Sequence, residues 1–195
     1  MPDSMRAIRI VPLLVVLAAL LPTHARAELE CADWGSLLAR GCRTIADTWT
    51  NGGHELYLTG YAYHVPATWT PEKRAELNSN GWGGGYGRSV DDADGDNHAV
   101  FGIAFLDSHR NVQFQIGYAW HRFWGPRDGL QAGLGYTAMI AQRPDIWNGV
   151  PFPVVLPLAA LRYRKATLEM TFIPTLSGNL NHGSTLFAFG RVALD

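Results

Sequence analysis

The sequence predicts an all-β protein, an eight-stranded antiparallel outer-membrane β-barrel preceded by a short N-terminal amphipathic helix. Long segments alternate between bulky apolar residues and small or polar residues, which is the period of a strand with two different faces. Trp and Tyr residues gather near the ends of these segments, as in the aromatic girdles of membrane barrels. With 195 residues, 47% of them hydrophobic and 17% charged, the chain suits one folded domain.

Residues 1–27 have the pattern of a secretory signal peptide. Arg6 and Arg9 form the positive start, residues 10–21 form an apolar stretch, and Ala25–Ala27 is a small-x-small cleavage site. The apolar stretch is too short to span a bilayer as a helix. We therefore expect an exported mature chain, with residues 28–195 forming the outer-membrane β-barrel domain.

Residues 32–49 form the helical candidate, since Leu38, Ile45 and Trp49 are among the apolar residues that can line one face. Cys31 lies just before this segment and Cys42 lies within it. Export makes a disulfide between them plausible. A continuous helix would separate them by roughly 16 Å, beyond the roughly 7 Å limit for bridged α-carbons. Either a glycine breaks the helix and they pair, or they stay apart.

Eight strand candidates follow, over a barrel of about residues 54–193. In residues 112–124 the even positions are mostly bulky and the odd positions mostly small or polar, and residues 130–141 repeat this division. A soluble eight-stranded barrel or sandwich is the alternative, but it would expose the bulky faces to water. The candidates are residues 54–66, 81–90, 98–107, 112–124, 129–142, 151–164, 166–174 and 184–193.

His64 ends the first candidate strand and Asp107-Ser108 ends the third. In an up-and-down barrel both strand ends lie on one rim, so these side chains can meet. If Asp107 and His64 point inward, alternation predicts an apolar lumen below them. The expected inward residues are Phe105, Ile103 and Phe101 on the third strand, and Ala62, Gly60, Leu58 and Leu56 on the first.

These three residue types can perform acyl chemistry. His64 suits a general base on an attacking hydroxyl, and Asp107 suits a group that either orients His64 or polarises the ester carbonyl indirectly through hydrogen bonds. Ser108 is either a nucleophile or a donor to an oxyanion. Asp107 and Ser108 converge only if the chain turns at this point, because adjacent strand residues point to opposite faces. Solvated loop residues are the alternative.

Pro157 and Pro174 lie in neighbouring late strands. Proline donates no ladder hydrogen bond, so this pair predicts a seam in an otherwise closed wall. Alternatively, the prolines merely end short strands.

Three stretches in order, residues 61–64, 81–87 and 104–108, resemble the lipid A palmitoyltransferase family PagP. The resemblance runs from about Asp47 to Phe189 and includes residues 153–158 and 171–174. It implies an eight-stranded outer-membrane barrel that transfers a palmitoyl chain from a phospholipid to a hydroxyl of lipid A, giving resistance to antimicrobial peptides. It also implies that His64, Asp107 and Ser108 are the essential residues.

The resemblance assigns further residues. Lys73, in the first long loop, matches a lysine used toward lipopolysaccharide, although a solvated loop charge is an equal alternative. Pro157 and Pro174 match prolines that flank a lateral entrance for the phospholipid. Ala119 matches a glycine at the floor of the acyl pocket, so its methyl group raises that floor. Thr59 and Gly81 stand where the family has prolines at a second gap.

The remaining expectations concern partners. The formal charge of −1, without a basic run, argues against nucleic acid. The partners implied are the phospholipid donor, the lipid A acceptor and outer-membrane lipids, with the protein as a monomer. No cofactor and no metal are implied, and His98, His109 and His121 show no metal-ligand spacing. The rivals are a non-catalytic structural or adhesin barrel and a soluble lipid-binding barrel.

Overall fold

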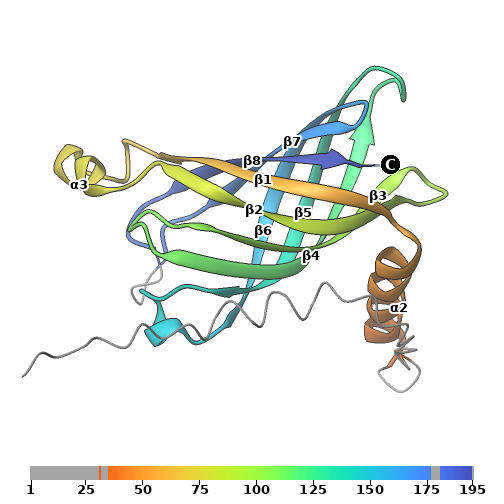
Figure 1. The fold of residues 1–195 in the computed structure, drawn as a ribbon, viewed down its shortest axis with the longest axis horizontal. Helices are drawn as coiled ribbons and strands as arrows, with labels where there is room; N and C mark the ends of the chain where they lie inside the picture. Colours follow the sequence, from red (N-terminus) through yellow and green to blue (C-terminus); the bar gives the residue numbers. More distant parts are fainter. Residues whose placement is uncertain (1–30, 32–34, 177–180, 195) are drawn as a thin grey trace, which may run out of the picture. The chain divides into compact units, whose positions relative to one another are not determined.

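The computed structural model describes Cys31 and residues 35–176 and 181–194, so the predicted signal peptide lies outside it. Eight strands form a closed antiparallel barrel in chain order, and β1 pairs with β8 to complete the wall (Figure 1). The predicted fold class is confirmed, and each strand lies within two residues of its predicted bounds. The strands are β1 (Gly53–His64), β2 (Asn80–Asp91), β3 (Asp96–Leu106), β4 (Val112–Trp124), β5 (Leu130–Gln142), β6 (Phe152–Tyr163), β7 (Ala166–Ile173) and β8 (Thr185–Ala193).

Helix α2 (Gly35–Asn51) precedes the barrel and packs against β2 and β3. Gly35, with φ 71°, starts it after Cys31, and Cys31 forms a disulfide with Cys42 across 5.7 Å between α-carbons. Of the two arrangements left open by the sequence, the structure has the paired one. Leu38, Ile45 and Trp49 are exposed on this helix, and the Trp49 ring also contacts Tyr86 of β2 edge-on.

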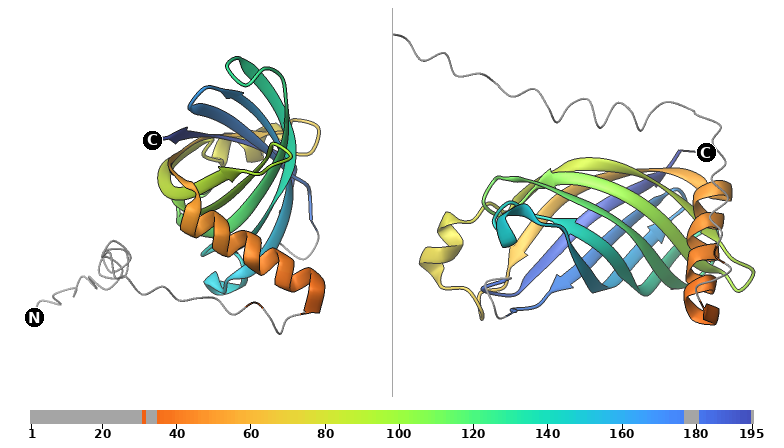
Figure 2. Two further views of the ribbon diagram at one scale, coloured as in Figure 1. Left: turned by 90° about the vertical axis from the view of Figure 1, so that its right-hand side faces the viewer. Right: turned by 90° about the horizontal axis from the view of Figure 1, so that it is seen from below.

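Two short elements were not predicted, α3 (Pro71–Glu76) and the 3-10 turn η1 (Trp147–Gly149). Helices α2 and α3 lie at opposite ends of the barrel (Figure 2). Among the helices that the structure describes, none has the length and hydropathy needed to cross a membrane.

The two faces of the strands differ as the alternation predicts. On β4, Phe114 and Ile116 are exposed while Gln113 and Ala119 are buried. On β7, Leu168 is exposed and Glu169 is buried. The wall thus has an apolar outer face, which is the arrangement of a barrel surrounded by lipid.

Strand β1 departs from the predicted alternation. Ala62 is buried as expected, but Leu56 and Leu58 are 41% and 52% exposed, and Tyr57 and Thr59 are buried instead. The register of β1 with both neighbours shifts between Thr59 and Tyr61, which is a β-bulge. A bulge inserts one residue and reverses the alternation beyond it. The prediction that Gly60, Leu58 and Leu56 continue the inward face below Ala62 is therefore wrong. Gly60 lies in the bulge, and Leu58 and Leu56 point outward.

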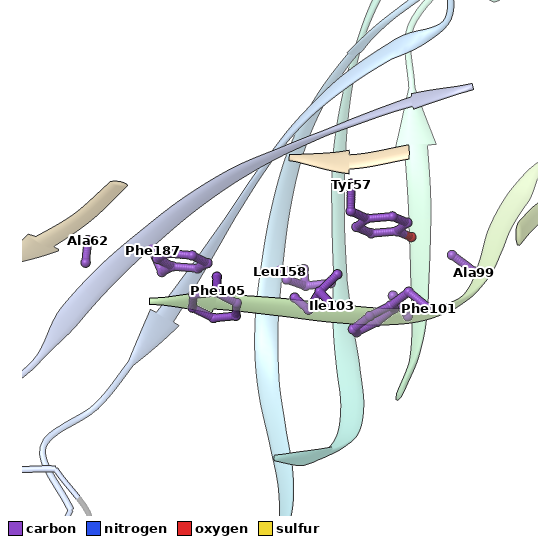
Figure 3. Packing of buried hydrophobic residues seen from close by; sticks show 9 residues of the cluster. Tyr57, Ala62, Ala99, Phe101, Ile103, Phe105, Leu158 and Phe187 are labelled. Carbon is purple, nitrogen blue, oxygen red and sulfur yellow. The ribbon is translucent and has the colours of Figure 1, made fainter. Parts of the chain in front are cut away.

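The barrel interior has two parts. The part toward the His64 end is apolar, and its residues come from several strands (Figure 3). Deeper, an ionic layer crosses the lumen: the Arg191 guanidinium lies 2.9 Å from Glu169 and 3.1 Å from Glu55, and His121 Nε2 lies 2.8 Å from Glu169. An apolar lumen is therefore correct only for the upper part. The apolar cluster comprises Tyr57, Ala62, Ala99, Phe101, Ile103, Phe105, Ala119, Leu158 and Phe187.

Candidate active site

A histidine and a serine meet at the rim where β1 and β3 end. His64 is the last residue of β1 and Ser108 follows β3, and His64 Nε2 lies 2.9 Å from Ser108 Oγ. His64 is 5% exposed, so little water competes for this contact. A hydroxyl within hydrogen-bonding distance of an imidazole is the geometry of a nucleophile or proton donor beside its base.

Asp107 forms the turn that presents Ser108. Its Oδ1 accepts hydrogen bonds from the backbone N–H groups of His109 and Asn111, each at 2.8 Å. Its own N–H donates to the Asn111 carbonyl at 2.8 Å, which closes the turn. No hydrogen bond joins Asp107 to His64 among the described residues, so the structure places Asp107 as the organiser of the turn rather than as the residue orienting His64.

The first loop, residues 65–79, reaches the same two residues. Asn78 donates its backbone N–H to the Ser108 carbonyl at 2.8 Å. Trp69 lies with its ring edge-on to His64, with centroids 5.7 Å apart, and its indole N–H donates to the Ser184 carbonyl at 3.0 Å. Sequence reasoning missed both residues, because Trp69 and Asn78 stand in a loop with no periodic pattern.

An apolar cavity of about 1270 Å³ runs down from His64 and Ser108. Phe105, Ile103 and Phe101 of β3 line it, as predicted, and Phe187 stacks on Phe105 with centroids 4.9 Å apart (Figure 3). Ala119 lies deeper on its wall. The deepest lining residues include Tyr57 and Glu169, where the ionic layer begins, so the cavity passes from apolar to polar at its base.

The wall has a seam beside this cavity. Strands β6 and β7 pair from Tyr163–Ala166 only as far as Leu158–Thr171, whereas β6 continues pairing with β5 to Phe152. Pro157 and Pro174 border the unpaired stretch, and both line the cavity. At the position of the family's second gap, where Thr59 and Gly81 replace prolines, Thr59 Oγ1 donates to the Gly81 carbonyl at 2.5 Å and the β1–β2 wall is bonded.

Lys73 lies on α3 at the mouth of the cavity. Its ammonium is 2.8 Å from Glu76, and this hydrogen bond lowers the pKa of the Glu76 carboxyl. Both side chains are exposed, so the pair is weak and Lys73 is available to an incoming anion.

The fold and the site together define a class of protein: a barrel with an apolar outer wall that carries a histidine–serine pair above an apolar cavity. Residues 44–191 match the family described as antimicrobial peptide resistance and lipid A acylation protein PagP. The chain belongs to this family, as the resemblance in the sequence implied.

Individual relatives of the chain carry the name of the same family. A protein of Legionella pneumophila called lipid A acyltransferase PagP is 38% identical over 95% of this chain and 99% of its own length. Its namesake in Bordetella pertussis strain Tohama I is 41% identical over 88% of this chain and 92% of its own. That of Methylobacillus flagellatus is 40% identical over 85% and 89%.

Proposed function

We propose that this protein is a phospholipid:lipid A acyltransferase of the outer membrane. It transfers a palmitoyl or similar long acyl chain from a phospholipid to a hydroxyl of lipid A at the outer face, which supports resistance to antimicrobial peptides. The observation that carries the proposal is the 2.9 Å contact between His64 and Ser108 at the mouth of an apolar cavity.

The cavity suits one acyl chain. From Asp107 down β3 to Ala99, which pairs with Ala119, the strand descends about 18 Å at a tilt near 45°. A sixteen-carbon chain is about 20 Å long, at roughly 1.3 Å per bond, so a palmitoyl chain fills the apolar part with its ester at the His64–Ser108 pair. Ala119 and Tyr57 form the floor of the acyl pocket.

Two routes use the same contact. In the covalent route, Ser108 Oγ attacks the phospholipid ester, and His64 takes its proton and returns it to the departing lysophospholipid. The lipid A hydroxyl then attacks the acyl-Ser108 ester, and its proton passes through His64 back to Ser108 Oγ. In the direct route, His64 takes the proton of the lipid A hydroxyl as its oxygen attacks the phospholipid ester carbonyl, and Ser108 donates a hydrogen bond to the oxyanion. The ester bond to the phospholipid then breaks, and His64 returns the proton to the departing lysophospholipid. Incubation with the phospholipid donor alone distinguishes them, since only the covalent route leaves an acyl mass on the protein.

The donor enters through the wall. The unpaired stretch between β6 and β7, bordered by Pro157 and Pro174, opens the cavity sideways toward the lipid. An acyl chain can then pass from the membrane into the cavity without crossing water. Lys73 at the mouth offers a positive charge to the phosphates of lipid A.

Mass spectrometry of lipid A tests the function. Cells that produce the wild type should gain about one palmitoyl mass on lipid A, and His64→Ala and Ser108→Ala should abolish the gain. The control is His98→Ala, a histidine paired with Asp92 near the opposite rim, which should keep the gain. Heat-modifiable gel mobility establishes that each barrel is folded.

Two outcomes favour the rivals. No gain with the folded wild type indicates a non-catalytic barrel, and fractionation into the aqueous phase without detergent indicates a soluble lipid-binding barrel. The proposal includes a monomer, and it includes removal of residues 1–27 on export, which N-terminal sequencing of the mature chain tests.

A further inference from the structure

Three potential metal ligands converge beside Ser108 from two separate loops. Asp107 and His109 belong to the β3–β4 turn, and Asp145 belongs to the connection between β5 and β6. One ligand atom of each residue lies within 4.8 Å of those of the other two. The sequence shows no ligand spacing here because the third residue comes from the next pair of strands.

Asp107 supplies an oxygen that the protein leaves unused. The residue is 5% exposed, and its Oδ1 already accepts two backbone N–H groups. Its Oδ2 is shielded from water and has no hydrogen-bond partner within the part of the chain that the structure describes. A buried carboxylate oxygen without a donor is costly, and a cation would remove that cost.

His109 and Asp145 are spaced as two ligands of one ion. His109 Nδ1 lies 3.4 Å from Asp145 Oδ2, longer than the 2.7–2.9 Å typical of a charge-assisted hydrogen bond. Two vertices of a tetrahedron with metal–ligand bonds of about 2.1 Å are about 3.4 Å apart. Both side chains are partly exposed, so an ion can reach them from solvent.

Arg143 fixes the third ligand. It donates to both oxygens of Asp145, at 3.1 and 2.8 Å, in a bidentate pair. An outer partner that orients a ligating carboxylate is common at metal sites. Because Arg143 is itself a cation, we expect micromolar affinity.

We propose that Asp107, His109 and Asp145 bind one divalent cation of the zinc or manganese class. An imidazole with two carboxylates is a donor set that these ions accept, whereas calcium and magnesium prefer oxygen alone. The bound ion would join the β3–β4 turn, which presents Ser108, to the β5–β6 connection. This inference concerns binding and does not depend on the proposed acyl transfer.

Isothermal titration of the purified full-length mature chain in detergent with Zn²⁺ tests the site. The wild type should bind one ion per chain at micromolar concentration. His109→Ala and Asp145→Asn should each weaken binding at least tenfold. His98→Ala is the matched control, since it removes a histidine that faces a carboxylate, Asp92, outside the three-ligand cluster, and its affinity should equal that of the wild type.

Equal Zn²⁺ affinity in the wild type and the two ligand variants, or no binding in the wild type, would overturn the proposal and leave His109 as a neighbour of two carboxylates with no metal between them. Ca²⁺ binding as tight as Zn²⁺ binding would exclude the imidazole as a ligand and equally overturn it. Heat-modifiable mobility establishes that the variants are folded. Since the readout is heat of binding, its result stands apart from any result on lipid A.

Discussion

Replacing Gly183 by Ala should slow acyl transfer by displacing Trp69. The Cβ atom added at Gly183 would lie 2.4 Å from Cε2 and 2.5 Å from Nε1 of the Trp69 indole. These distances are about 1 Å shorter than an ordinary contact, so the indole must move by about that distance. The movement breaks its hydrogen bond to Ser184 and its edge contact with His64, worth about 1 kcal/mol each.

A loss of about 2 kcal/mol in the positioning of His64 corresponds to about a thirtyfold fall in rate. The assay is acyl transfer in detergent micelles, with kcat and KM measured separately. The expected change is mainly in kcat, because Trp69 lines the cavity at its His64 end and the residues of the deeper acyl pocket keep their places. Gly102→Ala is the matched control, since the added Cβ meets nothing within 4 Å, and it should leave kcat unchanged. A folded Gly183→Ala variant with wild-type kcat would refute the role of Trp69 in holding His64.

Three further predictions concern the cavity and the wall. Ala119→Leu should shorten the preferred acyl chain by about two to three carbons, read as the added mass on lipid A, because its side chain extends about 3 Å further into the floor. Pro157→Val should close the seam by restoring a strand N–H and slow transfer at least threefold in membranes but not in detergent, where donor entry is not confined to the wall. Glu169→Leu should destabilise the folded barrel by about 3–5 kcal/mol in urea titrations, because the buried Arg191 guanidinium loses one of its two carboxylate partners and keeps only Glu55.

The fold was predictable because lipid and lumen impose opposite requirements on alternate residues. In β4 and β7 the bulky residues lie outward and the small or polar ones inward. The two-residue period is therefore enough to assign each residue of these strands to the lipid face or the lumen face. The turns between strands also follow from composition, as in the run of aspartates at residues 91–96. Strand bounds and barrel closure therefore required no knowledge of distant contacts.

The β1 error has a local cause. Gly60 lies in the bulge between Thr59 and Tyr61, and one inserted residue exchanges the faces of all residues before it. The one signal in residues 56–62 is Gly60, since a glycine inside a strand often marks a bulge, whereas Leu56 and Leu58 suit lipid and lumen alike. The exchange brings Glu55 and Tyr57 into the lumen, where they meet Arg191 and Phe101.

The site was predictable only in part. The meeting of His64 with Ser108 follows from topology, since odd strands end on one rim. The contacts made by Trp69 and Asn78 depend on how a loop folds back across 115 and 30 residues of sequence respectively, and no periodic pattern encodes such a path. For the same reason Asp145 could not be placed beside Asp107.

The exchange of faces in β1 also explains how the cavity can be closed below. Had Leu56 and Leu58 pointed inward, Arg191 would face aliphatic side chains and would lack the carboxylate of Glu55. With the bulge, Arg191 is held between Glu55 and Glu169, and His121 adds a second contact to Glu169. A charged layer of this kind repels a methylene chain, because hydrocarbon cannot replace its hydrogen bonds. The bulge near the rim thus sets two properties of the lumen at once: an apolar upper part that accepts an acyl chain and an ionic lower part that stops it.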